Sequence, residues 1–233
     1  MYPENTMLAF EKAAAIDGLT GIELDIQLTK DDHIVVMHDE WVNRTTDGNG
    51  RVVDFTLEQI KKLKIKSDTG FEQVPTIEEV LDLLAPRFKV GFKLNIELKN
   101  SDITYVGMEE KIIDVVHRYG AAENIVYSSF SAASIARIKQ IDKNAKTGIL
   151  DTTVSNCFYA AKGGCGADAL HPYWQSIDMT KKQLEGYTVR AWLLGHLYPE
   201  KPTGNKLDLS KLEEKGITDV FLNEPERYLN SAS

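Results

Sequence analysis

Two carboxylates alternate along one predicted strand near the start of the chain. Glu23 and Asp25 lie two positions apart in GIELDIQL, so their side chains point to the same face of a strand. The residues that alternate with them are apolar and form the opposite face. Two carboxylates on one buried face repel each other, so they need a cation unless one takes up a proton. Such hard oxygen ligands favour Mg²⁺ or Ca²⁺ over zinc, and a solvated strand face beside lysines is the alternative.

A histidine is expected close to this carboxylate pair. The next predicted strand follows after only TKDD, which is too short for a crossover helix, so the two strands form a hairpin. A turn centred between Asp31 and Asp32 places Asp25 opposite His38, to within one or two residues. A histidine beside a metal-type carboxylate pair is a candidate acid or base, whereas a structural or solvated histidine is the alternative.

A third carboxylate follows the same pattern further along the chain. In NIELK, Glu97 and Lys99 share one strand face, which Asn95 joins. A carboxylate and an ammonium beside a metal suit an anionic substrate, and an internal Glu97–Lys99 ion pair is the alternative. His171 and Trp192 also lie at the ends of predicted strands, in ALHP and RAWLL. In a barrel of parallel strands, inward residues at the carboxyl ends of the strands build the active site.

The elements that must position these residues alternate between strand and helix. After residue 90, strand-like runs such as KTGIL and TDVFLN (218–223) are separated by helical patterns such as MEEKIIDVVHRYG. This alternation predicts a parallel sheet, and the number of units favours a closed (β/α)8 barrel of the TIM type over an open sheet. Residues 40–74 hold scattered glycines, scattered charges and one short helical run, which predicts an insertion into the single domain formed by 1–233. The capping-box residues Thr76 and Glu79 then begin the next helix.

Composition excludes several classes of protein. A chain of 233 residues with a net charge of −8 has no clustered basic surface for nucleic acid. No apolar run approaches the roughly 18 residues of a membrane-spanning helix, so no membrane anchor is predicted. Cys157 and Cys165 are interpreted as reduced thiols, with a disulfide as the alternative. Reduced thiols favour a cytoplasmic protein, although a signal peptide stays open because the start of the sequence looks incomplete.

Taken in order, these motifs resemble the glycerophosphodiester phosphodiesterase family, and the similarity covers nearly the whole chain. The matching segments are PENTMLAF (3–10), IELDIQLTKDD (22–32), VVMHDEWVNRTTDGNG (35–50), VPTIEEVL (74–81), NIELK (95–99), SSF (128–130) and ALHP (169–172).

The resemblance implies a distorted (β/α) barrel with a small insertion after the His-Asp motif. It implies metal-dependent hydrolysis of small glycerophosphodiesters, such as glycerophosphocholine and glycerophosphoethanolamine, to glycerol 3-phosphate and an alcohol. By this likeness Glu23, Asp25 and Glu97 are ligands of one divalent cation, and His38 is one of two catalytic histidines. The implied substrate-binding residues are Lys99, Phe130, His171 and Trp192.

The family also carries a strand that ends in His-Arg-Gly a few residues before PENT, and this strand is absent from the sequence. We therefore expect a preceding segment to supply the second histidine and a strand between the strand of Glu23 and the strand at 218–223. Two alternatives stay open: a phosphodiesterase of the same fold for phosphoinositides or lysolipids, and a non-catalytic relative that binds the metal. The acidic charge and the lack of an apolar anchor favour soluble substrates.

Overall fold

The computed structural model describes residues 2–68, 70–193 and 206–229. The chain forms two compact units, Met1–Tyr127 and Ser128–Ser233, which are described in turn. In the described residues, no helix has the length and apolar character needed to cross a bilayer.

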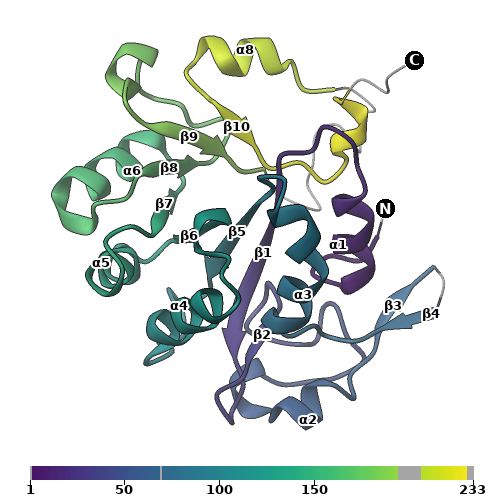
Figure 1. The fold of residues 1–233 in the computed structure, drawn as a ribbon. Coiled ribbons are helices and arrows are strands. Elements are labelled where there is room, and N and C mark those ends of the chain that lie inside the picture. Colours follow the sequence, from purple (N-terminus) through teal and green to yellow (C-terminus); the bar gives the residue numbers. More distant parts are fainter. Residues whose placement is uncertain (1, 69, 194–205, 230–233) are drawn as a thin grey trace. The chain divides into compact units, whose positions relative to one another are not determined.

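The first unit combines a small sheet with helices and an insertion. Figure 1 labels its elements: α1 (Met7–Ala14), β1 (Gly21–Leu28), β2 (Ile34–Val36), η1 (Val52–Asp54), α2 (Leu57–Ile60), β3 (Ile65–Ser67), β4 (Gly70–Glu72), α3 (Ile77–Phe88), β5 (Lys93–Leu98), α4 (Met108–Arg118) and η2 (Ala122–Asn124). The strand β6 (Ile125–Ser129) follows at the boundary between the units. Within the sheet, β1 pairs in parallel with β5 on one side and antiparallel with β2 on the other.

Strand β1 is central in the first unit, because it pairs with both β2 and β5 and contacts α1. Its apolar residues Leu24 and Ile26 are completely buried, as a period of two predicts for a strand with one face in the core. Helices α1 and α3 pack against each other, and α1 also contacts β1. Helix α3 begins at the capping box of Thr76 and Glu79, which confirms the start predicted from the sequence.

The hairpin between β1 and β2 is confirmed, and its register differs by one residue from the pairing of Asp25 with His38, within the one or two residues allowed for in the prediction. The Met37 N–H donates to the Asp25 carbonyl over 3.0 Å, so Met37, not His38, lies opposite Asp25. The reason is the turn, which spans 29–33 with three residues in its loop rather than a two-residue centre. Asp32 adopts a left-handed conformation there (φ 64°), as the third loop residue of such turns commonly does.

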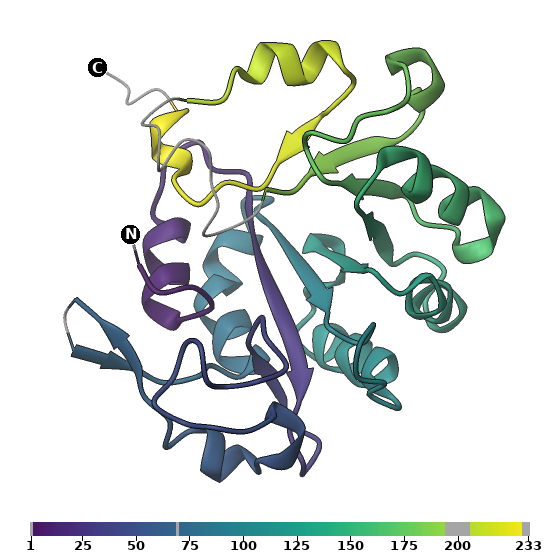
Figure 2. The same cartoon turned by 180° about the vertical axis from the view of Figure 1, so that it is seen from behind.

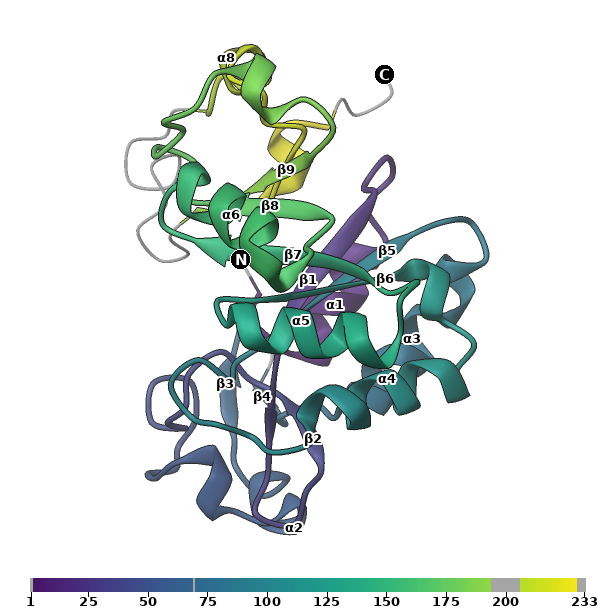
Figure 3. The ribbon, with the colours of Figure 1, turned by 90° about the vertical axis from the view of Figure 1, so that its left-hand side faces the viewer.

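The insertion after β2 forms a small core of its own. In Figure 1 and Figure 3 its short helix α2 lies past the carboxyl end of β1, whereas the hairpin of β3 and β4 lies to the side of that strand. The buried residues that hold it together are Val35, Met37, Val42, Val52, Ile60, Ile65 and Val74. The sequence-based prediction of an excursion at about 40–74 therefore corresponds to a locally packed segment of the first unit.

The second unit continues the alternation of strand and helix. Its elements are α5 (Ala132–Ile141), β7 (Lys146–Asp151), α6 (Val154–Ala160), η3 (Ala161–Cys165), β8 (Ala169–Pro172), η4 (Lys181–Leu184), β9 (Thr188–Ala191), α8 (Leu209–Glu214), β10 (Asp219–Val220) and η6 (Pro225–Arg227). Figure 2 shows the same strands from behind. The order β7–β8–β9–β10 is parallel throughout, which confirms the α/β class. Strand β10 is shorter than the run 218–223 predicted from the sequence.

A hydrophobic cluster under these strands contains both cysteines. Cys157 and Cys165 are buried and free, as the sequence predicted for structural thiols. Burial raises the pKa of the Cys157 thiol to about 12, so this side chain behaves as a packed apolar group rather than as a nucleophile.

Candidate active site

Three carboxylates gather on the adjacent strands β1 and β5. The parallel register places Asp25 beside Glu97 and Glu23 beside Asn95. One oxygen atom from each of Glu23, Asp25 and Glu97 lies within 4.8 Å of the others. Oxygens bound to one cation at roughly 2.1–2.5 Å must lie this close together, so the predicted convergence is confirmed.

The electrostatics of this carboxylate cluster fit a cation. Burial, followed by the charges of Asp25 and Glu97, raises the pKa of Glu23 well above its usual range. Burial and then the neighbouring Asp25 raise the pKa of Glu97 to about 7. The cluster therefore holds more negative charge than its surroundings stabilise, and a bound divalent ion would remove that penalty. Three hard oxygen donors match Mg²⁺ or Ca²⁺, which the sequence predicted.

Lys99 supplies a positive charge at the edge of the cluster. Its Nζ atom lies 3.1 Å from Glu97 Oε1 and 4.0 Å from Asp25 Oδ1, and its side chain is only 12% exposed. Burial by itself would lower the pKa of Lys99, but the two carboxylates outweigh it and the pKa is raised. The same Nζ atom lies 3.5 Å from His38 Nε2. The Glu97–Lys99 ion pair exists, and it also brings an ammonium group to the predicted catalytic histidine.

His38 is exposed and oriented by a chain of charged groups. Its Nδ1 atom lies 2.7 Å from Asp39 Oδ1. Arg44 donates to both Asp39 oxygens over 2.6 and 2.8 Å, and donates to the Glu4 carboxylate with two further N–H groups. The Arg44 hydrogen bonds hold the pKa of Asp39 at about 2, so Asp39 is ionised and accepts a hydrogen bond from Nδ1–H of His38. Nε2 is then the ring atom left to exchange a proton with a substrate.

Asn5 fastens the metal-ligand candidate Asp25 to the first helix. Its Nδ2 group donates to Asp25 Oδ2 over 2.9 Å, and its Oδ1 atom accepts from the Asp25 backbone N–H over 3.4 Å. Asn5 adopts a left-handed conformation (φ 52°), which asparagine tolerates better than most residues. The next residue, Thr6, caps α1 by accepting from the Ala9 N–H.

Sequence reasoning missed four members of this arrangement: Glu4, Asn5, Asp39 and Arg44. PENT marked only the start of a helix, and the pairing of Asn5 with Asp25 spans 20 residues of chain. The adjacent His38–Asp39 pair was a usable signal, because a carboxylate next to a candidate acid or base commonly orients it.

The remaining predicted site residues lie together in the second unit. Phe130 is 40% exposed, and its ring centroid lies 6.0 Å from that of Trp192 in an edge-to-face arrangement. Trp192 Nε1 donates to the carbonyls of His171 and Asp151 over 3.0 and 3.3 Å. The His171 ring itself is completely buried, and neither ring nitrogen has a hydrogen-bond partner among the described residues.

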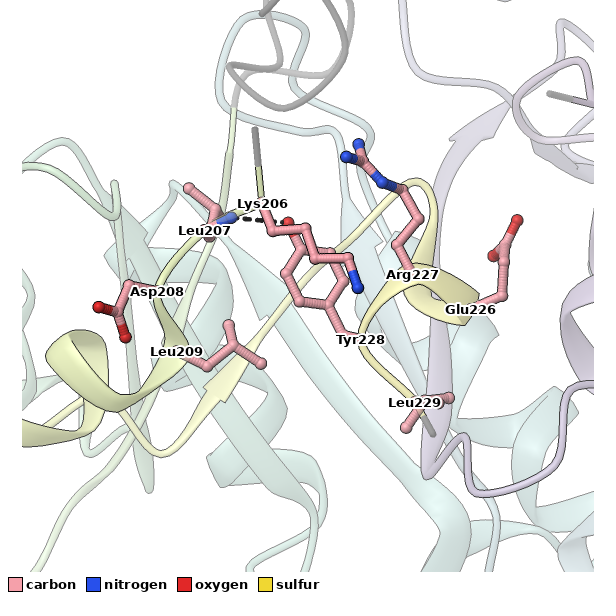
Figure 4. A pocket seen from close by; sticks show the side chains of 8 residues that line it. All are labelled: Lys206, Leu207, Asp208, Leu209, Glu226, Arg227, Tyr228 and Leu229. Atoms are coloured by element: carbon pink, nitrogen blue, oxygen red, sulfur yellow. Dashed lines mark hydrogen bonds between the residues drawn. The ribbon is translucent and has the colours of Figure 1, made fainter. Parts of the chain in front are cut away.

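A hollow of about 590 Å³ in the second unit has a different character. Figure 4 shows its lining, which consists of Lys206, Leu207, Asp208, Leu209, Glu226, Arg227, Tyr228 and Leu229. It contains none of the predicted site residues, and its acidic and basic side chains come in equal number. The carboxylate cluster is the candidate active site, because it is the one place among the described residues where metal-type ligands, a lysine and an oriented histidine converge.

The fold and this site define an α/β protein with a candidate divalent-metal centre and an adjacent candidate acid or base, His38. The model of the glycerophosphoryl diester phosphodiesterase family matches residues 1–162. The chain is 36% identical over 239 residues to the glycerophosphodiester phosphodiesterase of Caldanaerobacter subterraneus, covering 98% of this chain and 91% of that protein. It is 34% identical to the protein of the same name from Bacillus altitudinis, covering 97% and 91%. The chain therefore belongs to the glycerophosphoryl diester phosphodiesterase family.

Solved structures agree at the level of the fold. The phosphodiesterase of Oleispira antarctica, solved in complex with the product sn-glycerol-3-phosphate, superposes with a TM-score of 0.77. The sequence identity is 23%, and the match covers 97% of this chain and 90% of that structure. A glycerophosphoryl diester phosphodiesterase structure from Silicibacter pomeroyi gives a TM-score of 0.78 at 22% identity, covering 97% of this chain and 87% of that one.

Proposed function

We propose that this protein hydrolyses soluble glycerophosphodiesters to sn-glycerol 3-phosphate and an alcohol, with one bound Mg²⁺ or Ca²⁺. The observation that carries the proposal is the convergence of Glu23, Asp25 and Glu97 beside Lys99 and His38 in a member of this family. Relatives at 34–36% identity carry the name glycerophosphodiester phosphodiesterase, which supports the substrate class.

Each residue of the cluster has a defined task. Glu23, Asp25 and Glu97 would hold the cation, which would supply positive charge to the phosphoryl oxygens. Lys99 binds a non-bridging phosphoryl oxygen through its buried ammonium group, because that group keeps its charge beside the two carboxylates. The Lys99 ammonium opposes the negative charge that builds up on the phosphoryl oxygens during displacement, and a cation held by the three carboxylates would add to this effect.

His38 moves the proton. The ionised Asp39 fixes the imidazole with Nδ1 as the donor, so Nε2 exchanges a proton with the attacking group or with the leaving oxygen. During hydrolysis a bond forms between the incoming oxygen and phosphorus, and the bond between phosphorus and the alcohol oxygen breaks. The alcohol oxygen leaves with a proton. As a general acid, His38 donates this proton; as a general base, His38 first takes a proton from the attacking group.

The aromatic pair Phe130 and Trp192 is proposed to contact the carbon skeleton of the substrate. Their rings meet edge to face, and Phe130 keeps much of its surface accessible. The family resemblance predicts that His171 also contacts the substrate. Because its side chain is completely buried, this predicted contact is tested separately with a His171 variant.

The test is an assay of the purified chain with glycerophosphocholine and glycerophosphoethanolamine after removal of metal by a chelator. We expect release of glycerol 3-phosphate only after Mg²⁺ or Ca²⁺ is restored. Glu97→Gln should abolish the response to the cation, and Glu214→Gln, on the exposed surface of α8, should leave it unchanged. Hydrolysis of lysolipids or phosphoinositides alone would overturn the substrate class, and cation binding without hydrolysis of any phosphodiester would overturn the enzymatic function.

A further inference from the structure

The polar face of β1 does not end with the metal-ligand candidates. Gln27 follows Glu23 and Asp25 at the next position of the same face, and it is completely buried. Its Nε2 group donates to three main-chain carbonyls in a row, those of Met37 (3.1 Å), His38 (3.2 Å) and Asp39 (2.5 Å). Two N–H hydrogens are thus shared among three acceptors, all in the turn that carries His38 and Asp39.

This turn lacks the support that a strand would give it. Strand β2 ends at Val36, and Met37 makes the last main-chain hydrogen bond toward β1. Among the described residues, no main-chain N–H donates to the carbonyl of His38 or of Asp39. Main-chain hydrogen bonds hold the neighbouring residues on both sides, from Met37 N–H to Asp25 and from Val52 N–H to Glu40, and the Gln27 amide supplies the donor for the two carbonyls between them.

Tyr105 fixes the orientation of this amide. Its hydroxyl donates to Gln27 Oε1 over 2.8 Å, and its side chain is almost fully buried in the loop before α4. The main-chain carbonyls accept from the Nε2 group of Gln27, and the Tyr105 hydroxyl donates to its Oε1 atom, so the amide can adopt only one of its two orientations. Burial raises the pKa of Tyr105, so its hydroxyl keeps the proton that it donates.

We propose that Gln27, oriented by Tyr105, is a positioning residue for His38 in phosphodiester hydrolysis. It does not contact the substrate: it sets the backbone of residues 37–39 so that His38 Nδ1 meets Asp39 and Nε2 faces Lys99. The inference rests on the proposed function, because it assigns Gln27 to the turnover that His38 performs. The strand that carries two metal-ligand candidates thus also determines where the acid–base group lies.

The experiment uses the full chain with its cation and the variants Gln27→Met and Tyr105→Phe. Methionine keeps the length of the side chain without its amide, and phenylalanine removes only the hydroxyl. We expect kcat to fall about 10–100-fold in Gln27→Met and by a smaller factor in Tyr105→Phe, because displacements near 1 Å of a catalytic group cost up to about 10² in rate. The KM of the substrate and the Kd of the cation should change less than about threefold. Gln140→Met and Tyr159→Phe, both on exposed surfaces of the second unit, are the matched controls.

A double-mutant comparison separates positioning from a general loss of structure. If Gln27 acts through His38, adding Gln27→Met to His38→Ala should lower the residual rate less than about twofold. An equal loss in both backgrounds, or wild-type kcat in Gln27→Met, would overturn the proposal. Should Gln27→Met not fold, Tyr105→Phe in the same two backgrounds decides the question by the same criterion.

A second readout does not depend on turnover. In the NMR spectrum of ¹⁵N-labelled protein, the hydrogen bond to Asp39 should protect the Nδ1 proton of His38 from exchange with water, so that its signal is visible in the wild type. In Gln27→Met this signal should be broadened or lost. A signal identical in both proteins would refute the positioning role even if the wild type proved inactive. Absence of hydrolysis by the wild type, with the signal changed as expected, would refute the proposed function and leave the structural role of Gln27 in place.

Discussion

His38 and His171 both follow strand patterns in the sequence, yet the structure gives them opposite surroundings. The His38 side chain is 52% exposed, and Asp39, itself held by Arg44, orients its ring. The His171 ring is completely buried in the second unit, where it packs edge to face on Phe221. It occupies the space that the missing side chain of Gly148 leaves, since a methyl group there would overlap the ring.

The contrast shows what distinguishes a histidine that can exchange protons. His38 combines solvent access with a carboxylate that fixes its tautomer, which is the arrangement of a general acid or base. Burial lowers the pKa of His171 to about 3, so this ring stays neutral at any pH at which the protein would be assayed. Both histidines lie at the end of a predicted strand. The residues around each ring determine whether it can exchange a proton.

The largest expected effect tests the His38 side of the comparison. His38→Ala should lower kcat for glycerophosphocholine by about 10²–10⁴, because a positioned acid or base contributes this much to proton transfer. The Kd of the cation should stay within about threefold, since none of the three carboxylates is altered. His33→Ala, in the turn between β1 and β2, is the matched control and should keep wild-type turnover. Near-normal activity of His38→Ala would remove the distinction drawn between the two histidines.

A smaller effect is expected in the stability of the metal-free protein. Burial and then the charge of Asp25 raise the pKa of Glu97 to about 7 in the folded protein, above the 4.5 of an ordinary glutamate. Between these values the folded state holds a proton that the unfolded state has lost, so the free energy of unfolding must fall as the pH rises from about 4.5 to 7. The shift corresponds to a loss on the order of 3 kcal/mol.

Denaturant unfolding in the presence of a chelator measures this change. The difference between wild type and Glu97→Gln isolates the contribution of Glu97, because the glutamine does not titrate. Added Mg²⁺ should reduce the fall in stability between about pH 4.5 and 7, since the ion offsets the repulsion within the cluster. If the free energy of unfolding depended on pH in the same way in the wild type and in Glu97→Gln, the pKa of Glu97 would not be raised in the folded protein.

The smallest effect on turnover is expected at His171. As a substrate contact, its loss should raise KM at least about tenfold, because a buried polar interaction of roughly 1.4 kcal/mol or more is removed. As a packing residue, it should tolerate His171→Leu with little change in KM. We expect KM to change less than about threefold and the thermal stability to hold or rise, since two buried nitrogens without described partners are removed. A large rise in KM would restore His171 to the substrate site.

How much the sequence could predict depended on how local the determining contacts are. The side-by-side carboxylates follow from a period of two in β1 and β5, so Glu23, Asp25 and Glu97 were predictable as a set. The hairpin register differs by one residue from the expected pairing, because the left-handed conformation of Asp32 lengthens the loop and the sequence does not specify it.

The supporting contacts were beyond the sequence for a different reason. Gln27 and Tyr105 are 78 residues apart, and Glu4 and Arg44 are 40 residues apart. From the sequence alone, Gln27 cannot be distinguished from any other polar residue of a strand, because its hydrogen-bond partners are distant in the sequence or belong to the main chain. Closure of the (β/α)8 barrel and the role of Phe130 and Trp192 at its opening stay predictions.

The tripeptide Glu4–Asn5–Thr6 connects three parts of the candidate site. Glu4 contacts Arg44, Asn5 contacts Asp25, and Thr6 caps α1. These three neighbours tie the orientation of the acid–base group, the geometry of a metal ligand and the start of a helix to one short backbone segment. By thermodynamic reciprocity, a cation that bound Asp25 more tightly in the conformation held by Asn5 would also stabilise the left-handed backbone at Asn5 and the first turn of α1.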